Sequence, residues 1–200
     1  MQDKLIKILS LFIFVVILTT TNIRAQENDS LYHINVELGL GPSFYFTDIT
    51  YEELKHNYPV AVSLRLMWKP EHKLSLGIET GFVPLYFLKT KIYNTIYGTT
   101  ESKLSMNSVP IVAVFAMTIV ENLRIFGGIG GFLLISNTES FDNKVSSSTW
   151  SNAYEFGLSY LYPLGKNLKL GGEVKSFYIT RVENYDLIFN VSLKYSLFSY

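Results

Sequence analysis

The sequence predicts an all-β protein, an eight-stranded antiparallel up-and-down transmembrane β-barrel that follows an N-terminal signal peptide. Three observations lead to this fold class. Apolar and polar side chains alternate with a period of two along most of the chain after residue 30, which is typical of strands whose two faces meet different surroundings. Short and long connections alternate between these segments. The composition is also apolar, because 48% of the 200 residues are hydrophobic and only 17% are charged.

The N-terminus has the parts of an export signal. Two lysines precede the apolar run 9–18, and a polar stretch then leads to a cleavage site after Ala25. This run is shorter than the ~20 residues that a membrane-spanning helix needs. We therefore expect three regions: a signal peptide over 1–25, a short periplasmic segment over 26–30, and one barrel domain over 31–200.

Alternation marks the strands. In the segment 60–68 the even positions are Val, Val, Leu, Leu and Trp, whereas the odd positions are Ala, Ser, Arg and Met. The same division predicts eight strands, near 31–46, 58–68, 74–87, 104–118, 123–135, 150–162, 168–180 and 185–198. The fourth of these is apolar on both faces, which we interpret as a dry part of the lumen.

The connections suggest two different sides of a membrane. Short turns are expected at 69–73, 120–122 and 163–167. Longer polar connections are expected at 47–57, 88–101 and 136–149, with a tighter return at 181–184. Short periplasmic turns opposite long extracellular loops are typical of outer-membrane barrels, and an even strand count leaves both termini in the periplasm.

The period alone does not say which face is inside, because a soluble lipocalin-like carrier would alternate in the same way. An eight-stranded barrel has an interior just wide enough to be filled by side chains. The apolar face carries bulky Leu, Phe, Tyr and Trp, whereas the other face is mostly Gly, Ala and Ser with about one charge per strand. Only the second set fits inside, which favours the membrane barrel.

Aromatic residues are expected as girdles at the two membrane interfaces. The periplasmic girdle would consist of Tyr32, Trp68, Tyr160, Tyr162 and Tyr195. The outer girdle would consist of Phe44, Tyr86, Trp150 and Tyr178.

Charged residues on the polar face predict a network that closes the lumen. Its expected members are Glu37, Arg65, Glu79, Glu155, Glu173, Lys175 and Lys194. Counting from the turns places Glu155 opposite Lys175 and Glu79 diagonal to Arg65, and Glu37 can meet Lys194 on the closing strand. Unpaired charges in so narrow a lumen would cost several kcal/mol each. An ion or proton path is the alternative interpretation of these charges.

Three segments resemble a known family. They are Asn107–Ile111 at the start of a strand, the glycine-rich Phe126–Phe132, and the aromatic-ended final strand. In these features residues 31–200 resemble the small porin-like outer-membrane barrels of the OmpA/OmpX type. The resemblance implies a bacterial outer-membrane protein, with lipid as its surroundings and a C-terminal strand read by the barrel-assembly machinery. Alternation places Phe198 and Tyr200 out of phase with Tyr195, so the aromatic that serves as this signal stays open.

The sequence offers few parts for catalysis. His33, His56 and His72 fall on a strand, a long loop and a short turn, so they predict neither a metal cluster nor a catalytic triad. The chain has no cysteine, and its 17 basic and 17 acidic residues form no polybasic patch for nucleic acid. We therefore expect no enzymatic activity, no cofactor, no metal and no nucleic-acid partner, and we expect a monomer.

Three functions remain open. The first is a structural or surface-interaction role through extracellular loops at 51–57, 93–101 and 139–150, with an unknown partner. The second is a narrow pore for small solutes. The third and weaker one is a soluble periplasmic lipocalin-like carrier.

Overall fold

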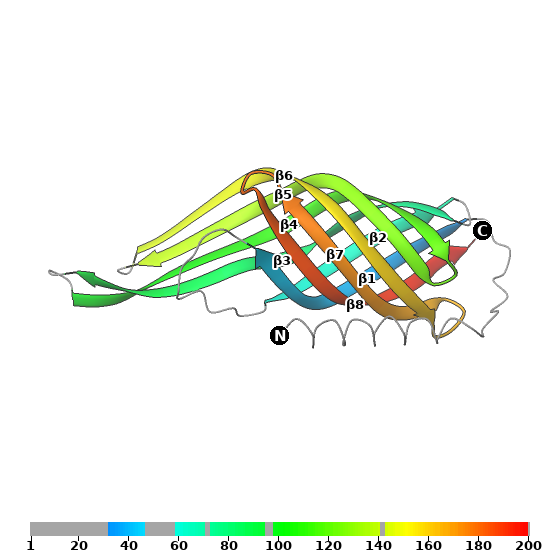
Figure 1. The fold of residues 1–200 in the computed structure, drawn as a ribbon, viewed down its shortest axis with the longest axis horizontal. Helices are drawn as coiled ribbons and strands as arrows, with labels where there is room; N and C mark the ends of the chain where they lie inside the picture. Colours follow the sequence, from blue (N-terminus) through cyan, green and yellow to red (C-terminus); the bar gives the residue numbers. More distant parts are fainter. Residues whose placement is uncertain (1–31, 47–58, 71–72, 95–97, 141–142, 200) are drawn as a thin grey trace, which may run out of the picture.

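The computed structural model describes residues 32–46, 59–70, 73–94, 98–140 and 143–199, and they form one closed antiparallel barrel (Figure 1). The strands follow the chain order around the barrel, so the predicted eight-stranded up-and-down topology is confirmed. Their bounds are β1 (His33–Phe46), β2 (Val60–Lys69), β3 (Leu74–Asn94), β4 (Gly98–Val120), β5 (Leu123–Ser140), β6 (Asn143–Pro163), β7 (Leu168–Ile179) and β8 (Asn184–Ser199). Within the described residues, no helix is both long and apolar enough to cross a membrane.

The two faces of the strands are sorted by size and charge. Large apolar side chains point outward, and Ile78, Ile129 and Phe156 are each about 60% exposed, at 61%, 59% and 58%. The charged side chains lie inside, where Arg65 and Glu79 are almost fully buried. A soluble carrier would have the opposite arrangement, so the lipocalin-like alternative is wrong.

Two regions that we expected to be loops are strands instead. β3 and β4 remain paired as far as Asn94 and Gly98, and β5 and β6 as far as Ser140 and Asn143. The predicted connections at 88–101 and 136–149 are therefore mostly long hairpins. In the hairpin of β5 and β6 alternation disappears because residues 143–148 are exposed on both faces, although backbone pairing continues. The third expected loop, at 47–57, lies outside the described residues.

These hairpins form a sheet that projects from the barrel. β2 pairs with β3 only as far as Phe82, and β7 pairs with β6 only as far as Ala153. β4 and β5 stay paired to Lys103 and Glu139. Beyond the barrel wall, β3 to β6 therefore continue as a four-stranded sheet, which extends at the end opposite the C-terminus (Figure 1). We call this the projecting sheet.

A β-bulge changes the face of one predicted girdle residue. Simple alternation places Tyr86 on the outer face, but the pairing of β3 with β4 shifts between Pro84 and Tyr86. One extra residue in a strand reverses the faces that follow it. Tyr86 consequently packs against the interior core, with its ring 6.0 Å from that of Tyr45. Its assignment to the outer girdle is wrong.

A second irregularity affects the final strand. The pairing of β1 with β8 shifts beside Ile34, so that Ile34 opposes Phe198 while Val36 opposes Tyr195. Both aromatic side chains are exposed, Phe198 by 64% and Tyr195 by 47%. The expectation that they lie on opposite faces is therefore wrong. The extra residue of the bulge turns Phe198 to the same outer face as Tyr195.

Candidate functional site

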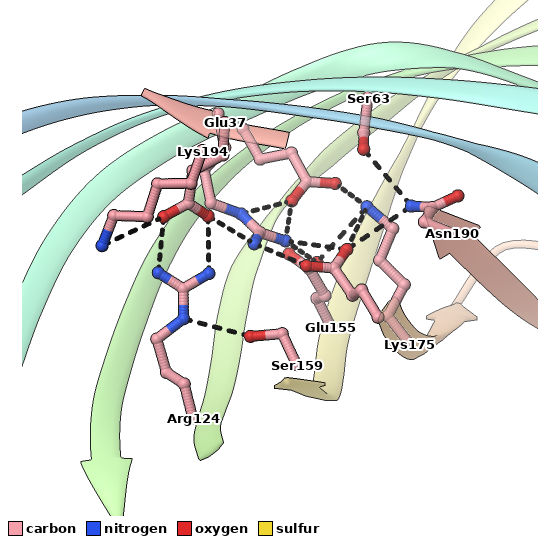
Figure 2. Close-up of polar contacts among 11 residues, drawn as sticks. Glu37, Ser63, Arg124, Glu155, Ser159, Lys175, Asn190 and Lys194 are labelled. Atoms are coloured by element: carbon pink, nitrogen blue, oxygen red, sulfur yellow. Dashed lines mark hydrogen bonds and ion pairs between the residues drawn. The ribbon is translucent and has the colours of Figure 1, made fainter. Parts of the chain in front are cut away.

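Eight buried or nearly buried charged side chains fill the middle of the barrel (Figure 2). Each comes from the inward face of its strand, and seven of the eight strands contribute. The members are Glu37 (β1), Arg65 (β2), Glu79 (β3), Arg124 (β5), Glu155 (β6), Glu173 and Lys175 (β7), and Lys194 (β8). We call this set the lumen network.

Arg65 is the hub of the lumen network. Its Nε donates to Glu79 Oε2 at 2.7 Å, and its Nη1 donates to Glu173 Oε2 at 2.9 Å. Longer contacts of 3.2 Å join it to Glu37 and Glu155. Only a planar guanidinium with five donors can serve so many carboxylates at once.

The other cations serve the carboxylates that surround Arg65. Arg124 binds Glu37 through both terminal nitrogens at 2.5 Å, and its Nε donates to Ser159 Oγ at 3.2 Å. Lys175 contacts Glu79 closely and lies 3.5 Å from Glu173. Lys194 lies 3.9 Å from Glu37 at the edge of the set.

The charges of the lumen network cancel. Four carboxylates face two guanidinium and two ammonium groups, so the formal charges of the set sum to zero. Removing one member of a buried ion pair costs about 3–5 kcal/mol, because the partner stays buried and uncompensated. The loss of any one of these charged side chains therefore leaves a buried charge without its partner.

Strand register explains which predicted contacts form. Arg65 directly opposes Glu79 rather than lying diagonal to it. Glu37 opposes Arg65 on one side and Lys194 on the other, as the closing of the barrel requires. The remaining contacts of Arg65, to Glu155 and Glu173, cross the lumen.

One predicted register is wrong. Gly157, and not Glu155, opposes Lys175, while Glu155 opposes Phe177. The turn between β6 and β7 is closed by backbone hydrogen bonds from Leu164 and from the next residue to the carbonyl of Leu168, which shifts the pairing by two residues. Lys175 Nζ nevertheless lies 3.9 Å from Glu155 Oε1, since its long side chain spans the difference.

Sequence reasoning missed Arg124. It is the only charged residue on the inward face of β5 between Leu123 and Leu134. A charge at an inward position of an otherwise apolar and glycine-rich strand is the signal that could have identified it. It also missed two polar residues of β8. Asn190 lies beside Glu173 and Ser63, and Asp186 accepts a hydrogen bond from Ser43.

Gly157 leaves space for the aromatic ring of Phe126 next to the Arg65 guanidinium. Phe126 lies under the Arg65 guanidinium, whose Cζ is 4.3 Å from the ring centroid. A Cβ atom on Gly157 would clash with this ring, because it would lie 2.8 Å from Phe126 Cε2 and closer still to Cζ. The ring therefore occupies the space above Gly157, in a cation–π contact with Arg65.

Gly157→Ala is expected to destabilise the barrel by about 1–3 kcal/mol, the usual cost of overpacking a filled interior. The new methyl group must displace the Phe126 ring from Arg65. Urea unfolding of the protein in lipid vesicles measures the change. Gly165→Ala is the matched control, because a Cβ there would meet no atom within 4 Å; equal effects of the two substitutions would contradict this packing.

The structure places most predicted girdle residues on the outer surface. At the end near the short turns, Tyr32, Trp68, Tyr162 and Tyr195 are 40%, 44%, 39% and 47% exposed, while Tyr160 is half-buried. At the other end, Trp150 is 54% exposed. Nearby, Phe44 packs edge-on against Phe189 with 5.7 Å between centroids, and Tyr178 lies 4.8 Å from Tyr185.

The histidines considered as catalytic or metal-binding candidates are only partly described. His33 lies in β1, whereas His56 and His72 fall outside the described residues. Among the described side chains, no three His, Cys, Asp or Glu residues form a group that could hold a metal ion.

A row of charges crosses the projecting sheet. Lys89 opposes Lys103, Lys103 opposes Glu139, and Glu139 opposes Lys144. Lys144 forms a close ion pair with Glu139, and Lys103 Nζ lies 3.9 Å from it. The hydrogen bond between Lys144 and Glu139 lowers the pKa of Glu139 and raises that of Lys144. Both are therefore charged at neutral pH, and the row of three lysines and one glutamate is cationic.

Comparisons with known proteins agree with this architecture. The family described as "Outer membrane protein beta-barrel domain" matches residues 11–195. The fold is similar to Ail, the attachment invasion locus protein of Yersinia pestis, solved with the heparin analogue sucrose octasulfate (14% identity, TM-score 0.55, 83% of this chain and 99% of that one). It is also similar to a major outer membrane protein from Thermus thermophilus (13% identity, TM-score 0.58, 83% and 99%). No curated protein sequence matches the chain.

Proposed function

Because the chain belongs to the outer membrane protein beta-barrel domain family, we propose that it is a closed outer-membrane anchor that presents the projecting sheet to an extracellular partner. The observation that carries this proposal is the continuation of β3 to β6 beyond the barrel wall. A barrel alone needs strands that only span the bilayer. The extra length of four strands builds a surface outside it.

The projecting sheet has properties of a contact surface. The residues of β6 between Asn143 and Ser148 are all exposed. Along the same stretch, the edge of β6 that faces away from β5 has no strand partner among the described residues. Unpaired edges are natural templates for an added strand. The cationic row lies across the same sheet, so the surface combines free backbone groups with positive charge.

The positive charge of the cationic row, formed by Lys89, Lys103, Glu139 and Lys144, favours an anionic partner. Ail, which shares the fold, was solved with a sulfated sugar. We expect the purified protein to bind sucrose octasulfate, and added salt to weaken binding because exposed charges are screened. The triple variant Lys89→Gln, Lys103→Gln, Lys144→Gln should bind severalfold more weakly.

The matched control changes three lysines at the opposite end of the barrel, Lys69→Gln, Lys166→Gln and Lys169→Gln. It lowers the net charge equally but leaves the projecting sheet intact. Calorimetric titration measures both variants. Equal losses in the two variants, or no binding by the unmodified protein, would contradict an anionic partner for this surface.

The closed lumen is the second part of the proposal. It is supported by the complete, neutral lumen network and by the buried rings of Phe126, Phe132 and Phe177. Planar-bilayer recordings of the purified protein should show no steady open state. A large, steady conductance would favour the narrow pore instead. Monomeric state and recognition of β8 by the barrel-assembly machinery stay predictions.

A further inference from the structure

A buried carboxylate lies toward the projecting-sheet end of the interior, apart from the lumen network. Asp186 on β8 is fully buried, and its Oδ1 accepts a hydrogen bond of 2.7 Å from Ser43 Oγ. The second oxygen, Oδ2, is also buried and has no hydrogen-bond partner among the described residues. Buried carboxylate oxygens almost always have a hydrogen-bond partner, so the lack of one for Oδ2 requires an explanation.

Asp186 is the one buried carboxylate of the described residues that lies outside the lumen network. The lumen network has four negative and four positive members, so it cannot lend a cation without losing its own balance. Lys175 is the member on the neighbouring strand, and it is already held by Glu79 and Glu173. No lysine or arginine of the described residues forms an ion pair with Asp186. Asp186 is therefore a buried carboxylate with no counter-charge in contact with it among the described residues.

Oxygen-bearing side chains occupy neighbouring inward positions on the two strands that meet at this carboxylate. Ser43 and Tyr45 are successive inward positions of β1, and Asn184 and Asp186 are successive inward positions of β8. Tyr45 directly opposes Asp186, and Asn184 Nδ2 donates to Tyr45 Oη at 2.9 Å. That bond uses the nitrogen of Asn184 and leaves its carbonyl oxygen available. Tyr45 and Asn184 are half-buried, whereas Ser43 and Asp186 are buried.

From this arrangement we infer that Asp186, Ser43, Tyr45 and Asn184 bind a single alkali-metal cation such as sodium. Hard cations prefer oxygen ligands, and these four residues offer a carboxylate, two hydroxyls and an amide oxygen. One positive charge neutralises the one carboxylate of this site. A divalent ion would leave the site positively charged and usually takes more than one carboxylate. This inference is independent of the proposed function of the projecting sheet.

The test uses the full mature chain folded in detergent micelles, with sodium chloride replaced by choline chloride at constant ionic strength. Sodium binding is measured from the broadening of the ²³Na resonance and from the thermal unfolding midpoint. We expect a saturable broadening, and a higher midpoint in sodium than in choline because sodium binds only the folded state. Asp186→Asn should abolish both effects. Glu139→Gln, which removes an exposed carboxylate, should retain both.

Ser43→Ala keeps the carboxylate but removes one ligand, and it covers the case in which Asp186→Asn does not fold. It should weaken sodium binding by roughly tenfold, the equivalent of one charge-assisted hydrogen bond. Equal broadening and equal midpoints for the unmodified protein and Asp186→Asn would overturn the inference. So would the absence of any difference between sodium and choline in the unmodified protein, because the carboxylate would then be neutralised by a proton.

Discussion

Arg65→Met is expected to lower the free energy of unfolding by about 3–5 kcal/mol, the cost of breaking a buried ion pair by removing one partner. Methionine has a similar length but no charge, so the space stays largely filled while the hub disappears. Glu37, Glu79, Glu155 and Glu173 then have only Arg124, Lys175 and Lys194 as counter-charges. The interior acquires one uncompensated negative charge.

Urea unfolding of the protein in lipid vesicles measures this loss. Lys144→Met is the matched control, because it removes one cation from an exposed ion pair on the projecting sheet. Exposed pairs contribute little, so the control should keep the midpoint of the unmodified protein. A loss below about 1 kcal/mol for Arg65→Met, the range of solvent-exposed pairs, would show that water rather than a tight network fills the lumen.

Ile129→Arg is expected to destabilise the inserted barrel by about 2–4 kcal/mol, the cost of an arginine on the lipid face near the bilayer midplane. Ile129 is 59% exposed. It lies on β5 between Leu123 near the periplasmic girdle and Leu133, which opposes Trp150 of the outer girdle. Its outward side chain should therefore contact the middle of the lipid chains.

Val145→Arg is the control for this prediction, because Val145 is 64% exposed but lies on the projecting sheet. A charge in water there should cost little. Unfolding in lipid vesicles compares the two variants. Equal destabilisation by both would contradict the assignment of the barrel wall to the membrane and of the hairpins to the exterior.

The barrel could be predicted from the sequence because lipid and lumen impose opposite demands on successive side chains. Where both faces of a strand meet water, as between Asn143 and Ser148, this contrast vanishes and the segment resembles a polar loop. The single-residue bulges beside Tyr86 and Phe198 could not be predicted from the sequence either. Each leaves the strand apolar and changes only which face the following side chains occupy. Face assignments therefore failed at the bulges and held between them.

The members of the lumen network could be found more readily than their contacts. Pairs on neighbouring strands, such as Glu37 with Arg65, depend only on register. The contacts of Arg65 with Glu155 and Glu173 join residues 90 and 108 positions apart across the lumen. Those distances depend on how the strands are staggered when the barrel closes, which no local pattern encodes.

The two native tryptophans can show directly whether the apolar face of this barrel contacts lipid while its charged face fills the interior. Trp68 and Trp150 are the only tryptophans of the chain, and they lie on the outer face near opposite ends of the wall. Fluorescence is measured in vesicles whose lipids carry bromine near the headgroup or at mid-chain, with Trp68→Phe and Trp150→Phe isolating each residue. Both tryptophans should be quenched, and more strongly by bromine near the headgroup than by bromine at mid-chain. Fluorescence that is unaffected by brominated lipid but quenched by aqueous iodide would contradict it.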